Sequence, residues 1–144
     1  MGKPLKRKLS RAVPGKARPR LLPLFSKKPL SSNYLIVLST VPNGPTARRL
    51  AKLLVSERWA ACVNVMGGVQ SIYRWKGAVE SAREYLLIAK TTRRRFAALQ
   101  ARLAAAHPYE VPEIMAVPLA DGLAQYFSWI SENTSPLSKK ARSR

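Results

Sequence analysis

The sequence has very little cysteine and histidine, and this shortage excludes several kinds of fold and site. One cysteine, Cys62, and one histidine, His107, occur in 144 residues. A lone cysteine excludes an internal disulfide framework and a Cys-rich zinc fold, and a lone histidine excludes a multi-histidine metal cage within one chain. Long apolar runs are also missing. Runs such as Tyr34–Leu38 and Tyr85–Ala89 are far shorter than the roughly 20 residues of a membrane-spanning helix, so no membrane span is predicted.

Acidic residues are scarce, and the resulting positive charge is concentrated near the two ends of the chain. The sequence has 26 Lys and Arg against 7 Asp and Glu, a net charge of +19. Residues 1–32 hold ten of these basic residues, five prolines and no acid, and residues 133–144 hold four more basic residues and no acid. Such composition is typical of disorder. We therefore expect a disordered basic extension over 1–32, one folded domain over 33–132, and a disordered basic tail over 133–144.

Three roles are open for the basic extension. It could be a solvated arm without a specific role, a transit sequence for an organelle, or a weak contact for polyanions. The first of these is favoured, because the prolines break the amphipathic helix of a typical presequence. A nucleic-acid-binding function ranks last, since aromatic stacking motifs like those of RNA-recognition modules are missing. The expected location is cytoplasmic, or an organelle if the extension is a transit sequence.

Residue periodicity predicts the first elements of the folded part. Tyr34–Thr40 is a short apolar run of branched residues, which is typical of a strand buried on both faces. A helix is expected from Thr46, with apolar residues along one stripe. Trp59–Val65 is a second apolar strand, and Gly67-Gly68 is a turn signal.

A long hairpin is predicted next. Val69–Trp75 alternates with a period of two, Lys76-Gly77 forms a tight turn, and Val79–Lys90 continues as a long strand. A second helix begins after Thr91-Thr92 and ends near His107, because a proline follows and disfavours helical dihedrals in the residue before it.

A short strand and a terminal helix complete the predicted fold. The strand is expected over Glu113–Leu119 and the helix over Gly122–Ser131. The helix should turn four apolar residues inward: Leu123, Tyr126, Phe127 and Ile130. The order of elements is that of an α+β, ferredoxin-like sandwich with a repeated βαβ unit, a long β-hairpin and an extra C-terminal helix. One sheet face would be left open with more apolar surface than a monomer shows, which indicates assembly.

Several short strings resemble one protein family in order and spacing. They are E-R-W-A-A-C-V-N at Glu57–Asn64, S-I-Y-R-W-K-G at Ser71–Gly77, L-I-A-K-T-T at Leu87–Thr92, and H-P-Y-E-V-P-E-I at His107–Ile114. Pro118, Gly122 and Y-F-S-W-I at Tyr126–Ile130 follow in order. The sequence resembles the CutA divalent-cation-tolerance family over about 100 residues.

The resemblance implies a fold, an assembly and a function class. It implies the ferredoxin-like fold and a tight homotrimer, in which long hairpins pair their edges with neighbouring subunits. Family members are associated with tolerance to copper and other divalent metals, and no reaction is firmly attached to the family. Some eukaryotic relatives are linked to anchoring other proteins at membranes.

The metal candidates follow from this resemblance and from ligand chemistry. His107 and Glu113 are the expected ligands, because imidazole and carboxylate together suit copper or zinc. A neighbouring subunit would have to complete the site. In some bacterial relatives a cysteine that helps to hold copper stands at the position of Ser39, and a hydroxyl is a poorer ligand for a soft metal. Ser39 and Cys62 are therefore weaker candidates, and Cys62 is more easily explained as core. The alternative for His107 is a local structural role at the end of its helix.

The aromatic residues are expected mainly at subunit interfaces. Tyr73, Trp75, Tyr109 and Trp129 are the candidates, because aromatic side chains dominate interface energetics. Lining of a ligand pocket is the alternative. Three basic residues, Arg93–Arg95, oppose the dipole at the start of a helix and are expected as a solvated face, although such a patch could meet phosphate.

The sequence therefore predicts a non-enzymatic homotrimer of CutA type that binds or responds to a divalent metal, most naturally copper. No phosphate loop, serine–histidine–aspartate arrangement or zinc signature is present. The alternative is a trimeric small-ligand signalling or scaffold protein in which metal binding is incidental.

Overall fold

The structure is a computed structural model that describes residues 33–137. The basic extension expected over 1–32 lies outside the described residues, as do residues 138–144 of the expected tail. Residues 133–137 lie inside them, and the last helix continues through Thr134. Weak polyanion binding by the two basic segments stays a prediction.

A four-stranded antiparallel sheet forms the centre of the fold, as predicted. Its strands are β1 (Tyr34–Val41), β2 (Cys62–Trp75), β3 (Ala78–Thr92) and β4 (Met115–Pro118), in the spatial order β2-β3-β1-β4. This order leaves β2 and β4 as edges. The predicted α+β class is therefore confirmed, with the sheet order of a repeated βαβ unit.

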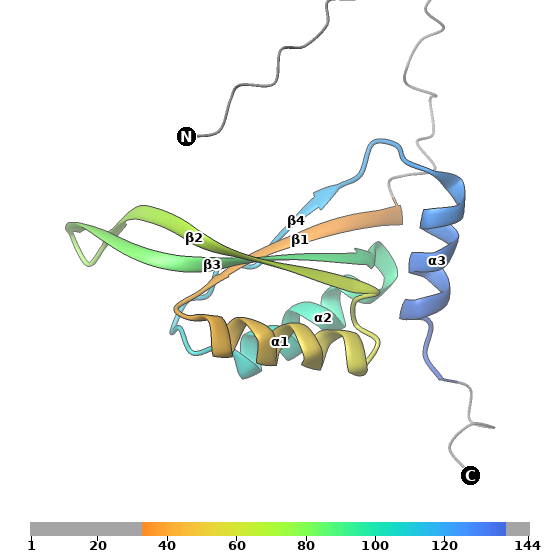
Figure 1. The fold of residues 1–144 in the computed structure, drawn as a ribbon, viewed down its shortest axis with the longest axis horizontal. Coiled ribbons are helices and arrows are strands. Elements are labelled where there is room, and N and C mark those ends of the chain that lie inside the picture. Colours follow the sequence, from red (N-terminus) through yellow and green to blue (C-terminus); the bar gives the residue numbers. More distant parts are fainter. Residues whose placement is uncertain (1–32, 138–144) are drawn as a thin grey trace, which may run out of the picture.

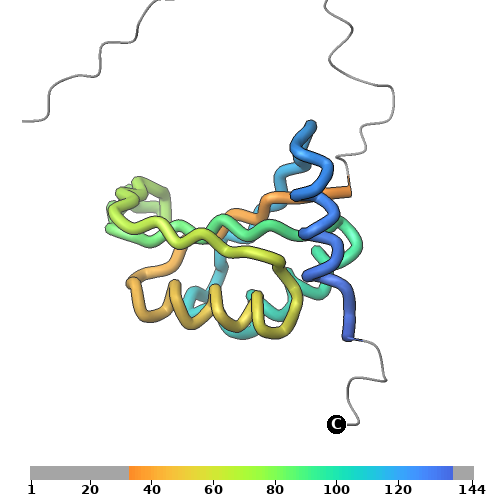
Figure 2. Tube along the Cα trace, turned by 45° about the vertical axis from the view of Figure 1, so that its right-hand side comes forward, coloured from red at the N-terminus to blue at the C-terminus, as the bar shows by residue number. Residues whose placement is uncertain are grey.

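Three helices accompany the sheet in two different places. Helices α1 (Gly44–Ser56) and α2 (Arg93–Ala106) lie along one face of the sheet (Figure 1). Helix α3 (Ala124–Thr134) stands at the end of the sheet opposite the hairpin tip, and the turned view in Figure 2 agrees. Within residues 33–137, no helix combines the length and apolar composition that crossing a membrane requires.

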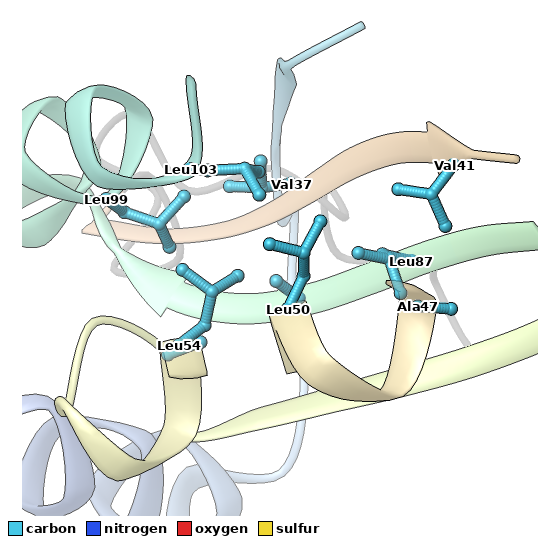
Figure 3. Close-up of a cluster of buried hydrophobic side chains, with 10 residues drawn as sticks. Val37, Val41, Ala47, Leu50, Leu54, Leu87, Leu99 and Leu103 are labelled. Carbon is cyan, nitrogen blue, oxygen red and sulfur yellow. The ribbon is translucent and has the colours of Figure 1, made fainter. Parts of the chain in front are cut away.

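The core lies between the sheet and the two covering helices. Leucines of α1 and α2 point toward the valines of β1 and Leu87 of β3 (Figure 3). Strand β1 alternates between buried and half-buried residues, with Leu35, Val37, Ser39 and Val41 buried. The expectation that this strand is buried on both faces is therefore wrong for a single chain. Helices cover only one face of the sheet, so the other face keeps partial contact with solvent.

The long hairpin is confirmed, but one expected turn within it is wrong. Lys76 and Gly77 have φ values of 46° and 82°, as a tight two-residue hairpin turn requires. Gly67 and Gly68 do not turn the chain. They form a β-bulge between Met66 and Val69, so that β2 runs on as one strand. Gly68 has a φ of 76°, and a Cβ on Gly67 would lie 2.9 Å from the Tyr85 ring, which explains why glycine suits both positions.

Helix α3 buries fewer residues than its sequence predicted. Ile130 is buried and Phe127 is half-buried against Tyr34, with ring centroids 4.4 Å apart. Leu123 and Tyr126, which were expected inward, are 69% and 41% exposed, so that prediction is wrong for a single chain. The helix packs mainly against β3, and one narrow stripe therefore suffices to hold it.

The hairpin and the free edges leave apolar side chains exposed. Ile72 and Val79 near the hairpin tip are 73% and 66% exposed, and Met115 and Val117 on edge strand β4 are about half exposed. Open edges and apolar patches of this kind invite pairing with another chain. This surface is the structural basis for the assembly considered below.

Candidate functional site

A cleft of about 730 Å³ lies between the hairpin and the loop that follows α2. Strands β2 and β3 supply one wall, and residues 108–113 supply the other. Its lining includes Tyr73, Trp75, Glu84, Tyr109 and Glu113. The fold thus brings residues that are far apart in the sequence to one place.

Carboxylates are concentrated in this cleft. Four of the seven acidic residues of the chain line it: Glu80, Glu84, Glu110 and Glu113. Arg74 is the one basic residue in the lining. In a protein with a net charge of +19, the cleft is therefore a local concentration of negative charge.

Glu84 is the most buried of these carboxylates. Glu84 is 7% exposed, and its Oε1 accepts a hydrogen bond of 2.8 Å from the Tyr109 hydroxyl. Burial and this carboxylate raise the pKa of Tyr109, so the phenol stays protonated and keeps donating. A buried carboxylate is expensive unless it is hydrogen-bonded or neutralised, and Tyr109 satisfies one of its two oxygens.

Glu113 is half-buried on the opposite wall. Its pKa is raised by burial and by the negative charge of Glu84. The two carboxylates therefore repel each other, and a cation bound between them would relieve the repulsion. Carboxylate oxygens are ligands that hard divalent cations prefer.

Glu113 was predicted from the sequence as a site residue, but Glu84 was not. Glu84 has no telling spacing, and it lies in a polar stretch of β3 that reads as solvent-exposed. Its burial arises opposite the bulge of β2, where Val69 pairs with Glu84 and Met66 pairs with Leu86. The sequence carried no signal for this arrangement.

His107 lies beside Ser39, but both ring nitrogens are already hydrogen-bonded. Nε2 lies 3.0 Å from the Thr40 carbonyl and 3.3 Å from the Ser39 hydroxyl, and Nδ1 accepts the Tyr109 backbone N–H at 3.1 Å. Because a carbonyl only accepts, Nε2 carries the proton and Nδ1 does not. Burial lowers the pKa of His107, which favours this neutral form.

These bonds bear directly on the ligand role predicted for His107. Coordination of a metal by either nitrogen would require the bond to Thr40 or the bond to Tyr109 to break. The ligand role stays a hypothesis, and the hydrogen bonds match the alternative of a structural residue at the end of α2.

The other weak metal candidate, Cys62, lies outside the cleft. It is half-buried at the start of β2, with its Sγ 3.7 Å from Lys90 Nζ. Among residues 33–137, no three His, Cys, Asp or Glu side chains are grouped closely enough to enclose a metal ion. A metal held by one chain would therefore keep open positions for water or for a neighbouring subunit.

The predicted interface aromatics fall into two groups. Tyr73, Trp75 and Tyr109 line the cleft, and Trp75 also has Lys76 Nζ 5.6 Å from its ring centroid. Trp129 lies on α3 and stacks on Tyr126 at 5.5 Å between centroids. Trp75 and Trp129 are each more than one-third exposed, so both surfaces are free to contact another chain.

The raised pKa of Glu113 predicts a stability change that depends on pH. The folded protein binds this proton more tightly than the unfolded chain, so stability falls as pH rises from the ordinary value of 4.5 through the folded value. We expect Glu113→Gln to be more stable than wild type at pH 7 by up to about 1 kcal/mol, and equal to it below about pH 4.

Guanidinium unfolding at the two pH values, with chelator present, measures this difference. Glu110→Gln is the matched control, because Glu110 lies in the same loop but is exposed. A Glu113→Gln variant that is less stable than wild type at pH 7 would show that the carboxylate is stabilised, not repelled, in the fold.

Comparison with known proteins gives one consistent family. Residues 35–133 match the family model described as CutA1 divalent ion tolerance protein. A protein of Thermus thermophilus named "Divalent-cation tolerance protein CutA" is 52% identical over 99 residues, which are 69% of this chain and 96% of that protein. "Protein CutA, chloroplastic" of Arabidopsis thaliana is 37% identical over 127 residues, covering 81% of this chain and 70% of that protein.

Solved structures agree with the sequence matches. The divalent cation tolerance protein of Thermus thermophilus has a TM-score of 0.69 at 51% identity, covering 71% of this chain and 99% of its own. A protein described as the periplasmic divalent cation tolerance protein CutA of Archaeoglobus fulgidus has a TM-score of 0.69 at 34% identity, covering 71% and 99%. Because these relatives are named for different compartments, the cytoplasmic location of this chain stays a prediction.

Proposed function

The chain belongs to the CutA1 divalent ion tolerance family, and from this premise we propose that it is a non-enzymatic homotrimer that binds a divalent metal ion in the acidic cleft. Glu84 and Glu113 are the proposed ligands. The neighbouring pair of carboxylates, one buried and one with a raised pKa, is the observation that supports this site.

The donor set bears on the identity of the ion. Oxygen donors from Glu84 and Glu113 favour hard ions such as manganese or magnesium. Imidazole is a good ligand for copper, but His107 could coordinate copper only if its hydrogen bond to Thr40 or Tyr109 broke. Copper therefore stays part of the proposal, and its coordination by His107 would have to compete with these hydrogen bonds.

The proposed trimer would help to complete the same site. A trimer would cover the exposed apolar side chains of the hairpin and pair the free edges of β2 and β4. The aromatic residues Tyr73 and Trp75 belong to the hairpin and line the cleft. A neighbouring chain that packs on the hairpin would therefore also enclose the cleft. A neighbour could then supply the ligands that one chain lacks.

A second candidate function rests on the size of the cleft. About 730 Å³ is more than a metal ion needs, and three aromatic side chains line the space. Clefts of this size hold small organic molecules in other proteins. A small-ligand signalling or scaffold role, with incidental metal binding, is therefore the alternative.

Calorimetric titration of the purified full chain separates these candidates. We expect manganese and copper chlorides each to give a saturable isotherm with one ion per chain at neutral pH. Sodium chloride at matched ionic strength serves as the reference for heat from the basic segments. An isotherm without saturation for every divalent ion tried would remove the metal-binding proposal and leave the small-ligand alternative.

A further inference from the structure

A second pocket lies far from the acidic cleft, at the start of α2. It has a volume of about 370 Å³, and α2, the first residues of β1 and the end of α3 surround it. We call it the arginine pocket and define it by six of its lining residues: Asn33, Thr92, Arg94, Arg95, Ser131 and Ser135. No acidic side chain lines it.

Arg95 is held in this pocket by packing instead of by a counter-charge. Its guanidinium lies over the Trp59 ring, 4.2 Å from the centroid, and its Nε is buried without a hydrogen-bond partner among the described residues. Its Nη2 donates to the Arg58 carbonyl at 3.4 Å, a long bond. The pKa of Arg95 is lowered by burial and by the charges of Arg94 and Arg58. Positive charge has therefore gathered here without neutralisation.

The nearby acids do not neutralise the pocket. Glu57 forms a salt bridge with Arg102, the one ion pair found between residues of the 33–137 range. Arg58 is also occupied, because its side chain donates to the carbonyl oxygens of Glu132 and Ser135 at the end of α3. Neither Arg94 nor Arg95 pairs with a carboxylate of the described residues.

The start of α2 adds to the same positive field. The N-cap residue, Thr92, makes no side-chain capping bond, and the first turn holds no acidic residue. The positive end of the helix dipole thus meets arginines, an arrangement that is unfavourable on its own. An anion in the pocket would reverse the sign of this interaction.

We propose that the arginine pocket binds a small ligand through a phosphate group. The planar guanidinium groups of Arg94 and Arg95 match the oxygens of a phosphate in paired hydrogen bonds. The Thr92 hydroxyl and the Asn33 amide, which also line the pocket, suit a polar ligand that extends beyond the phosphate. This site is independent of the metal proposed for the cleft.

Trp59 provides a local probe for the test. Because Arg95 stacks on its ring, a ligand that moves Arg95 should shift the indole N–H resonance of Trp59 in nuclear magnetic resonance spectra of the full chain. Inorganic phosphate and AMP are the ligands, with sodium chloride at matched ionic strength and adenosine as references.

We expect phosphate to shift the Trp59 resonance saturably, and Arg94→Gln to weaken the apparent affinity by about tenfold or more. Arg49→Gln is the matched control, because it removes an exposed arginine of α1 outside the pocket. It should change the affinity by no more than about twofold.

Two results would overturn the proposal. One is a shift that is linear in phosphate and equal to that produced by chloride, and the other is equal weakening in Arg94→Gln and Arg49→Gln. AMP that binds more tightly than phosphate would assign the pocket to a phosphorylated organic ligand. Equal affinities for AMP and phosphate would assign the pocket to free phosphate. Either result supports phosphate binding in the arginine pocket.

Discussion

The full chain is expected to sediment at the mass of three chains at micromolar concentration, and Trp75→Ala is expected to shift it toward single chains. Trp75 is 37% exposed and lies directly before the hairpin turn at Lys76-Gly77, near the more exposed Ile72 and Val79. Truncation of a large aromatic side chain in a packed contact costs about 3–5 kcal/mol. Loss of that much from an interface weakens association more than a hundredfold.

The matched control for this prediction is Val55→Ala. Val55 is an apolar residue of α1 with 41% exposure and is not part of the hairpin. It should leave the sedimentation unchanged. Wild-type protein that sediments as a single chain at this concentration would contradict the trimer and, with it, any site completed by a neighbouring subunit.

Loss of either proposed carboxylate ligand, Glu84 or Glu113, should have the second large effect. We expect Glu84→Gln and Glu113→Gln each to weaken binding of a divalent ion by about a hundredfold or more, because each removes a charged ligand. Tyr109→Phe should weaken it by about 10–100-fold, since it removes the hydrogen bond that orients Glu84. Calorimetry under the conditions of the wild-type titration measures these changes.

Two further variants sharpen this prediction. Glu132→Gln removes an exposed carboxylate of α3 outside the cleft and should bind the ion as wild type does. His107→Ala tests the imidazole role. Manganese binding that survives in this variant fits carboxylate ligation, whereas loss of copper binding with an intact trimer would assign His107 as a copper ligand. Equal affinity in wild type, Glu84→Gln and Glu113→Gln would contradict the cleft as the metal site.

The elements with strong periodicity were predictable from the sequence. Strand β1, helix α1 and the hairpin turn at Lys76-Gly77 follow from apolar runs, helical stripes and turn residues. The Gly67-Gly68 bulge was not, because a glycine pair signals equally a turn or an extra residue in a continuing strand. Local sequence does not distinguish a turn from a bulge, whereas the pairing of β2 with β3 shows that the glycines form a bulge.

Only part of the candidate site was predictable. The string around His107 and Glu113 drew attention to the loop after α2, and the structure places Ser39 beside His107. Glu84 was missed, because its burial depends on the contact with Tyr109, 25 residues further along the chain. Long-range contacts of this kind have no local signature in the sequence. The hydrogen bond between His107 and the Thr40 carbonyl is another such contact, and together with the bond from Tyr109 it leaves both nitrogens of His107 hydrogen-bonded.

The most direct test of the central claim is anomalous X-ray diffraction from crystals of the full chain soaked in manganese chloride. We expect an anomalous peak in the acidic cleft, within coordinating distance of carboxylate oxygens of Glu84 and Glu113 in each subunit. A peak at the imidazole of His107 or at Cys62, with the cleft carboxylates uncoordinated, would contradict it.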